Sequence, residues 1–257
     1  MDLISYIPLF LLVFVRISAF FVAAPIWNSQ QIPSQVKWGF SFCIAFITVG
    51  VIQPTQPLAW NSTYFLLVFK ELAVGLSLGF ASSLLLYAVE LAGSFIDLQS
   101  GFTMSSLFDQ KRGIQEPLTG KFYYIITMIF FLLSDGHHIL IKGIIQSYQW
   151  IAVDAWLPDS YSSNVVQVLL GIVDHMFWIS LLIAAPLVGT LFIVDVVLGI
   201  IARTVPQMNL FVVGVPIKLF VYYVMLYASI PVFLYILSQL VQTMISSIEQ
   251  MLRILGG

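Results

Sequence analysis

Cysteine and charged side chains are both scarce in this sequence of 257 residues. Charged residues make up only 9% of the chain, whereas soluble domains carry about 25%. So few charges cannot cover a water-facing surface of this size, which largely excludes a soluble globular enzyme. The single cysteine, Cys43, excludes an intrachain disulfide and leaves no cysteine cluster for a zinc site.

The sequence also lacks a surplus of positive charge. Lysine and arginine number 10 against 12 aspartates and glutamates, so the formal net charge is −2. This balance provides no basic stripe for a nucleic acid backbone, and no nucleic acid partner is expected. Hydrophobic residues make up 60% of the chain and the mean hydropathy is +1.00. These values exclude intrinsic disorder and leave an integral membrane protein as the remaining class.

Six apolar runs follow one another along the chain. They cover about 3–27, 38–52, 64–92, 122–133 or 122–141, 165–202 and 210–245. A bilayer core about 30 Å thick requires about 20 residues of helix, a length that the first, third and sixth runs reach. The second and fourth runs are short. The fifth would be roughly 57 Å long as a helix, so it must tilt, kink or break, with Pro186 and Gly189 as the expected place.

The linkers between these runs differ in charge and length. Lysine and arginine concentrate in the odd-numbered linkers, whereas the even-numbered linkers hold only Lys142. With six ordinary spans, the positive-inside rule places the odd-numbered linkers in the cytoplasm and both termini outside. Two linkers are long: residues 93–121 are polar, and residues 134–164 include an amphipathic piece at 139–156. Loops of this length in a compact protein are usually functional or disordered.

Small residues at helical spacing mark one predicted packing surface. Gly75 and Gly79 form a G-x-x-x-G pattern, which Ser83 continues four residues later. Small side chains at this spacing let another helix approach closely, so the pattern predicts close helix packing. Chance is the alternative, because the apolar runs contain many small residues. Ala185 and Gly189 repeat the spacing.

Charged residues inside the apolar runs are candidates for function, because each is costly unless it faces protein, water or an opposite charge. They are Arg16, Lys70, Glu71, Glu90, Asp174, Asp195 and Lys218. A proton or ion pathway is one interpretation, and salt bridges or caps between helices are the other. The second is favoured, because the acids are spread over different runs. Lys70 and Glu71 are adjacent and are expected to point to different sides of their helix.

Catalytic and cofactor motifs are missing, so neither enzymatic activity nor a cofactor is expected. The sequence contains no Walker loop, no G-x-S-x-G and no G-x-G-x-x-G. His137 and His138 are adjacent and should diverge on a helix, and no other group has metal-ligand spacing, so no metal site is predicted. The two histidines are expected instead to cap an apolar run.

The linker after the third run carries bulky apolar side chains. Residues 101–108 read Gly-Phe-Thr-Met-Ser-Ser-Leu-Phe, and the charged Asp-Gln-Lys-Arg follows. Exposed phenylalanine and methionine are costly unless they become buried. Either the loop folds back over its own helices or it fills a cavity that belongs to an assembly, and these residues alone leave both interpretations open.

Three segments resemble the family of flagellar biosynthetic protein FliR, part of the flagellar type III export gate. They are Asn-Ser-Gln-Gln-Ile-Pro at 28–33, Asp-Gly-His-His-Ile-Leu-Ile at 135–141, and Pro-Gln-Met-Asn-Leu-Phe-Val-Val-Gly-Val-Pro-Ile-Lys at 206–218. The last is the most specific, and the order and spacing match over nearly the whole chain. One departure is Asp135, where the family more often has asparagine. The second and third segments favour the flagellar member over its injectisome relative.

The resemblance implies a fold and partners. The fold would be an all-α, membrane-associated protein of long kinked helices in hairpins, within a helical cone assembly. Residues 1–160 would form a FliP-like part that includes a plug loop at 100–120, and residues 161–257 would form a FliQ-like hairpin with a C-terminal tail. The implied partners are FliP and FliQ subunits in a hetero-oligomer, FlhB, FlhA and membrane lipid, with exported flagellar proteins passing through. The implied location is the bacterial inner membrane, in the flagellar basal body.

The resemblance also implies functional residues and a function, an export channel sealed by a plug. The channel plug would contain Gly101, Phe102, Met104, Leu107, Phe108 and Ile114. The assembly and gate turn would contain Pro206, Gln207, Asn209, Gly214, Pro216 and Lys218. Lys218 is expected to pair with an acid or carbonyl of a neighbouring subunit. The alternatives are a stand-alone transporter or ion channel, a passive membrane anchor, or the equivalent injectisome subunit. No internal repeat supports a transporter.

Overall fold

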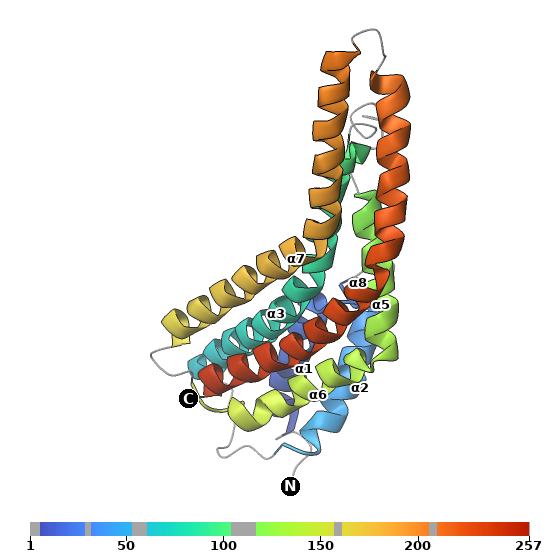
Figure 1. Cartoon of the computed structure of the whole chain (residues 1–257). Helices are drawn as coiled ribbons and strands as arrows, with labels where there is room; N and C mark the ends of the chain where they lie inside the picture. Colours follow the sequence, from blue (N-terminus) through green and yellow to red (C-terminus); the bar gives the residue numbers. More distant parts are fainter. Residues whose placement is uncertain are drawn as a thin grey trace. The chain divides into compact units, whose positions relative to one another are not determined.

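The computed structural model describes residues 6–28, 32–52, 61–103, 117–156, 161–205 and 210–256. Within these ranges every regular element is a helix (Figure 1). The helices are α1 (Ile7–Ala23), α2 (Ser34–Val49), α3 (Ser62–Ser100), α5 (Leu118–Leu133), α6 (Gly136–Trp150), α7 (Tyr161–Thr204) and α8 (Leu210–Gly256). The predicted all-α fold class is confirmed. The likeness of its parts to FliP and FliQ stays a prediction.

Prolines mark the starts of three helices. Pro8 lies in the first turn of α1, Pro33 is the residue that precedes α2, and Pro117 directly precedes α5. A proline is tolerated there because the first backbone N–H groups of a helix have no partner within the helix, and its fixed φ angle suits the helical turn. The local sequence therefore sets where these helices begin.

Three helices are long and apolar enough to cross a membrane: α3, with 39 residues, α7, with 44, and α8, with 47. Helices α5 and α6 pass the same test only together, and they are bent by 68° where they meet. The described residues therefore supply three candidate spans, or four if the bent pair crosses as one. The orientation derived above assumes six ordinary spans, and the described residues supply only three or four candidates, so they do not support that orientation.

Proline does not break the long helices. Helix α7 is continuous across Pro186, and α8 is continuous across Pro216 and Pro231. Each proline removes one backbone hydrogen bond from a helix that retains many others, and at Pro186 the carbonyl oxygen accepts a bond of 2.7 Å from the Thr190 hydroxyl. Of the three outcomes expected for the fifth run, a break at Pro186 is therefore absent, whereas a tilt or a kink stays a prediction.

Two predicted linkers turn out to be partly helical. Helix α3 continues to Ser100, well into the predicted linker at 93–121, and α6 lies inside the predicted linker at 134–164. Burial explains the first extension, because Ile96 is fully buried and Asp97 is only 3% exposed. These side chains are covered by other parts of the fold. The polar composition of the segment does not indicate this burial.

The chain separates into two compact units, each built from discontinuous segments. The first unit contains Met1–Leu85, Phe131–Val173 and Val241–Gly257, and the second contains Leu86–Phe130 and Asp174–Leu240. Helices α3, α7 and α8 each contribute to both units. The predicted division into residues 1–160 and 161–257 is based on likeness to FliP and FliQ, not on contacts within the chain. It therefore stays a prediction.

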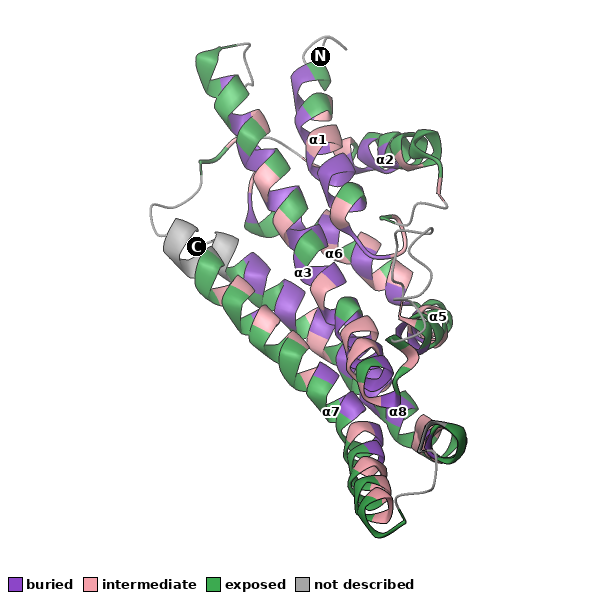
Figure 2. Cartoon of the chain, turned by 90° about the horizontal axis from the view of Figure 1, so that it is seen from above, coloured by how far each residue is buried: buried purple, intermediate pink, exposed green. Residues whose placement is uncertain are grey.

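Helix α1 provides much of the core of the first unit. Leu12, Val13 and Phe21 are fully buried, and Arg16 is buried with them. Aromatic rings extend this packing to α2, where the Phe42 ring lies 5.1 Å from that of Phe10. Figure 2 shows α1 largely in the colour of buried residues. The α1 helix is therefore an internal element of its unit.

The two longest helices are much less covered. In their most apolar stretches only 22% of α7 and 17% of α8 is buried, against 67% of α3. Much of α7 accordingly has the colour of exposed residues in Figure 2. In the second unit the later part of α7 and the first part of α8 form a helical hairpin (Figure 1). Large apolar faces of this hairpin remain uncovered by the chain.

Candidate functional site

Three charged side chains lie together inside the first unit. Two nitrogens of the Arg16 guanidinium on α1 donate to the Glu71 carboxylate of α3. One of them, Nη2, lies 2.9 Å from Oε1. The Lys70 Nζ lies 2.8 Å from the same Oε1, and all three residues are at most 2% exposed. The salt-bridge interpretation is confirmed for these residues. The expectation that Lys70 and Glu71 point apart is wrong, because the long lysine stem brings its ammonium back to the carboxylate.

Neutral groups of α6 and the residue after it complete the surroundings of Arg16. Its Nη1 donates to the Ser147 hydroxyl at 3.0 Å, and its Nη2 donates to the Ile151 carbonyl at 3.0 Å. The guanidinium carbon lies 4.1 Å from the centroid of the Tyr148 ring, a cation–π arrangement. Arg16 therefore holds α1, α3 and the end of α6 together through a single side chain.

Lys70 uses its ammonium to hold an irregular segment. Its Nζ donates to the carbonyl oxygens of Ala152, Val153 and Ala155 at 2.7, 2.9 and 3.0 Å. Residues 151–156, which follow α6, have no regular secondary structure. Such backbone is tolerated in a membrane protein where protein groups satisfy its polar atoms. The buried charge cluster, Arg16, Lys70 and Glu71, therefore fixes the path of the chain after α6.

The small residues Gly75 and Gly79 face the backbone of α1. A Cβ atom added to Gly75 would collide with the Arg16 carbonyl oxygen, and one added to Gly79 would lie 2.6 Å from the Phe20 carbonyl oxygen. Ser83 is buried, and its hydroxyl donates back within α3. At the two glycines the closely packed partner is the chain's own first helix.

In the second unit, Asp97 near the end of α3 holds the start of α5. Its carboxylate accepts the Thr119 backbone N–H at 2.9 Å and also accepts a bond from the Thr119 hydroxyl. The Tyr222 hydroxyl of α8 lies 2.8 Å from that of Thr119. The sequence analysis missed Asp97. Its only signal was an acid four residues before Gly101, within the predicted linker at 93–121.

Glycines let α3 and α5 meet closely beside this carboxylate. A Cβ atom on Gly93 would overlap the backbone of Gly120, and a Cβ atom on Gly120 would lie 2.9 Å from the Glu90 carbonyl oxygen. The backbones of the two helices are therefore in close contact. The connection between α3 and α5 starts and ends near this contact.

Two of the six predicted plug residues lie in the described part of the chain. Gly101 has φ +89°, in the left-handed region that favours glycine, and a Cβ atom added to it would meet no described atom within 4 Å. The Phe102 ring is half-buried and lies edge-on to the Tyr222 ring, with centroids 5.1 Å apart. For Phe102, packing on the chain's own helices is therefore observed. The remaining plug residues, Met104, Leu107, Phe108 and Ile114, lie outside the described residues.

The predicted assembly and gate turn is described in part. Pro206, Gln207 and Asn209 lie outside the described residues, whereas Gly214, Pro216 and Lys218 belong to α8.

Lys218 has a partner within the chain, and its expected pairing with a group of a neighbouring subunit stays a prediction. Its Nζ lies 2.7 Å from Oδ1 and 2.8 Å from Oδ2 of Asp195 on α7. The amide of Gln99 on α3 donates to the same carboxylate at 2.9 Å. A local reading of the turn could not identify this partner, because Asp195 lies 23 residues earlier in the sequence. The ion pair ties the two arms of the hairpin together.

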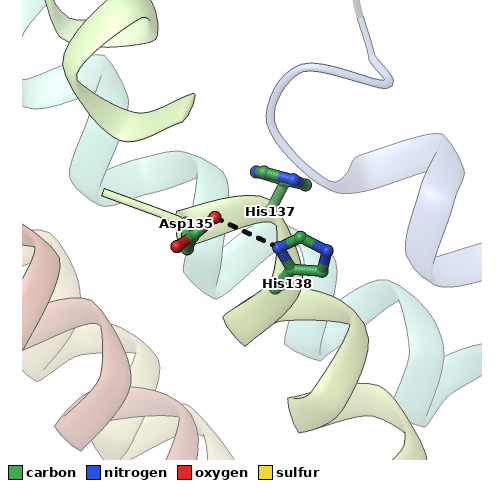
Figure 3. A group of neighbouring side chains, drawn as sticks. All are labelled: Asp135, His137 and His138. Atoms are coloured by element: carbon green, nitrogen blue, oxygen red, sulfur yellow. Dashed lines mark hydrogen bonds and ion pairs between the residues drawn. The ribbon is translucent and has the colours of Figure 1, made fainter. Parts of the chain in front are cut away.

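Asp135, His137 and His138 form a small polar group where α6 begins (Figure 3). Asp135 has a left-handed backbone with φ 55°, and its Oδ1 lies 3.3 Å from His138 Nδ1. The imidazole centroids are 4.1 Å apart, so the prediction that the rings diverge is wrong. The three side chains place one possible ligand atom each within 4.8 Å of the others. A cation there would face the positive end of the α6 dipole, which disfavours it.

The fold and these sites define a class of protein: a multi-pass membrane subunit with buried ion pairs and broad uncovered apolar faces. Residues 7–244 match the model of a protein family described as Bacterial export proteins, family 1, and the chain belongs to this family.

Individual relatives agree with this family. The chain is 39% identical to flagellar biosynthetic protein FliR of Bacillus subtilis, over 99% of the chain and 98% of the relative. It is 24% identical to FliR of Escherichia coli, over 84% of the chain and 82% of the relative. It is 30% identical to the surface presentation of antigens protein SpaR of Shigella flexneri, over 80% and 78%.

The comparisons confirm the resemblance drawn from the three sequence segments. The chain is a subunit of a type III export apparatus, and the family together with the apolar helices confirms a multi-pass protein of the bacterial inner membrane. The relatives are named for biosynthesis or presentation rather than for an enzymatic reaction.

Proposed function

We propose that this chain builds a protein-export channel together with FliP and FliQ subunits, and that residues 100–120 provide a plug that seals it. The uncovered hairpin of α7 and α8 carries the proposal. Within the second unit, residues 174–204 of α7 and 210–240 of α8 are each roughly 46 Å long at 1.5 Å per residue, about one and a half times a bilayer core of about 30 Å. Lipid can cover only part of such a length, so the remaining apolar surface requires protein partners.

The proposed plug rests on the composition of the segment. Its bulky apolar residues at 104, 107, 108 and 114 alternate with polar and charged ones, and Gly101 precedes them in a backbone conformation that suits glycine. A narrow apolar constriction excludes water and ions when a pore is idle. FlhB and FlhA, which the family resemblance also implies, are proposed as further partners of the assembled channel.

Co-expression tests the assembly. The chain would be purified alone and with FliP and FliQ, and the particles would be sized in detergent. We expect the chain alone to aggregate or to be degraded, because its apolar faces are uncovered, and a larger uniform particle to form with the two partners. A stable, monodisperse monomer would contradict the proposal and would favour a stand-alone transporter or channel.

Deletion of residues 104–114 tests the plug. This deletion spares Phe102, whose ring packs on Tyr222, so the described base of the segment is retained. We expect the complex to assemble with unchanged yield while cells become permeable to small ions, measured as membrane conductance. Loss of assembly would make the segment structural. Normal assembly without a leak would place the seal in another subunit.

A second candidate is the equivalent subunit of an injectisome, which the 30% identity to SpaR favours. The two candidates differ in the strain that the chain can restore. Motility in a strain lacking FliR supports the flagellar function, whereas secretion in a strain lacking SpaR supports the injectisome function.

A further inference from the structure

One face of α7 in the second unit carries an ionisable residue among exposed apolar and small residues. Asp174, Trp178, Leu181, Ala185 and Gly189 follow one another at spacings of three or four residues, so they share one side of the helix. All five are exposed, Trp178 at 64% and Leu181 at 52%. We call this surface the Asp174 face.

Asp174 differs from the other charged residues that the sequence placed inside apolar runs. Arg16, Lys70 and Glu71 satisfy one another, and Asp195 is paired with Lys218. No hydrogen bond or ion pair joins Asp174 to another residue in the described ranges. One turn away on either side, positions 170, 171, 177 and 178 hold leucine, glycine, phenylalanine and tryptophan, so the neighbouring turns of α7 supply no lysine or arginine.

The part of the Asp174 face that carries the small residues Ala185 and Gly189 is also uncovered in the described ranges. At Gly75 and Gly79 of α3, added Cβ atoms would strike the backbone of α1, so that small-residue surface already has its partner. At Gly189 an added Cβ would meet nothing within 4 Å. Small residues at this spacing allow the backbone of a second helix to approach closely. The Asp174 face therefore combines an open contact surface with a charge that needs a counter-charge.

We propose that the Asp174 face docks against a membrane helix of another export-gate subunit that carries a lysine or arginine level with Asp174. The proposal rests on the function proposed above and specifies the chemistry of one partner. Asp174 belongs to the candidate span Val166–Thr204, and wherever lipid covers that span its chains cannot neutralise a carboxylate. A second copy packed through the same face would add another carboxylate rather than a cation, which disfavours it.

The experiment co-expresses the chain with tagged FliP and FliQ and measures how much of the chain is recovered with the tag, relative to its amount in membranes. Asp174→Lys places like charges together and should lower recovery about tenfold or more. Asp174→Asn keeps the shape, removes the charge and should lower recovery by a smaller factor. His175→Gln, a change at the exposed neighbouring residue, is the matched control and should behave as the unmodified chain.

A second-site exchange identifies the counter-charge. In the presence of Asp174→Lys, each lysine or arginine within the apolar helices of the co-expressed subunits is changed to aspartate in turn. One such exchange should restore recovery, because the pair is rebuilt with its charges reversed. If Asp174→Lys fails to reach the membrane, Asp174→Asn remains the deciding variant.

The outcomes separate this inference from the function on which it rests. Recovery of Asp174→Asn equal to that of the unmodified chain overturns the inference and leaves the proposed function intact. Loss of recovery that no partner exchange restores also overturns it, since the charge then has no cation opposite. If the unmodified chain is not recovered with FliP and FliQ at all, the proposed function fails and this inference fails with it.

Discussion

The first unit and the α7–α8 hairpin of the second unit differ in whether their charged side chains are buried and partnered. In the first unit, Arg16, Lys70 and Glu71 are sealed inside and satisfied by groups of the same chain. On the hairpin, apolar faces are uncovered and Asp174 has no partner among the described residues. The first unit therefore satisfies its own buried charges, whereas the hairpin leaves apolar faces and one carboxylate open, as the proposed assembly requires.

Removing the buried anion should have the largest effect on this comparison. Glu71→Gln leaves the Arg16 and Lys70 charges buried together without a carboxylate, which should cost about 3–5 kcal/mol of stability. We expect the variant to be degraded, or the purified complex to unfold at a clearly lower temperature. Glu249→Gln, which neutralises an exposed carboxylate on α8, is the control and should change little. Equal behaviour of the two variants would show that the buried charge cluster does not stabilise the first unit.

Replacing a glycine of the small-residue surfaces by leucine should have different effects in the two regions. Gly79→Leu forces a side chain against the backbone of α1 and should destabilise the chain by about 1–3 kcal/mol or more. A Cβ atom at Gly189 meets nothing within 4 Å, so Gly189→Leu should leave the stability of the chain unchanged or slightly higher. Its effect should fall on assembly with other subunits instead. Thermal unfolding and co-purification measure the two effects. A Gly189→Leu variant that unfolds as easily as Gly79→Leu would break the distinction.

A smaller effect is expected where α3 holds the start of α5. Asp97→Asn keeps the size of the side chain but weakens the bonds to the Thr119 N–H and hydroxyl, at a cost of about 1 kcal/mol. The first turn of α5 should then exchange its amide hydrogens faster, as hydrogen–deuterium exchange measures, while the first unit keeps its protection. Unchanged exchange at Thr119 would contradict the assignment of Asp97 as the acceptor that fixes α5.

The smallest effect should come from the Lys218 pair. The pair is partly exposed, with side-chain exposures of 17% for Lys218 and 41% for Asp195, so Lys218→Ala should cost about 1 kcal/mol or less. The loosened hairpin should reduce export modestly, which motility on soft agar measures. The double change Lys218→Ala with Asp195→Ala should recover part of the loss. Normal motility of the single variant would remove Lys218 from the functional residues.

The sequence predicted the parts of this protein that depend on composition and local motifs. Scarce charge and long apolar runs predicted a membrane protein of helices, and the segment at 206–218 indicated its family. What it could not predict depends on partners distant along the chain. Arg16 meets Ser147 across 131 residues, and Lys70 meets Ala152 across 82. No local pattern encodes such a meeting. For the same reason the partner of Lys218 and the role of Asp97 were missed.

The make-up of the first unit also has a consequence for biosynthesis. Helix α1 leaves the ribosome early, yet its unit includes Val241–Gly257, where Met244, Met251 and Leu252 are buried. A Cβ atom added to Gly143 of α6 would lie 3.5 Å from the Ile248 side chain, so these late residues lie against α6. At about 5–20 residues per second, the nascent chain must wait roughly 10–50 s before that core can close. During this interval the apolar surfaces of the first unit lack their last partners, so we expect a newly made subunit to be most open to membrane proteases before the last turns of α8 are made.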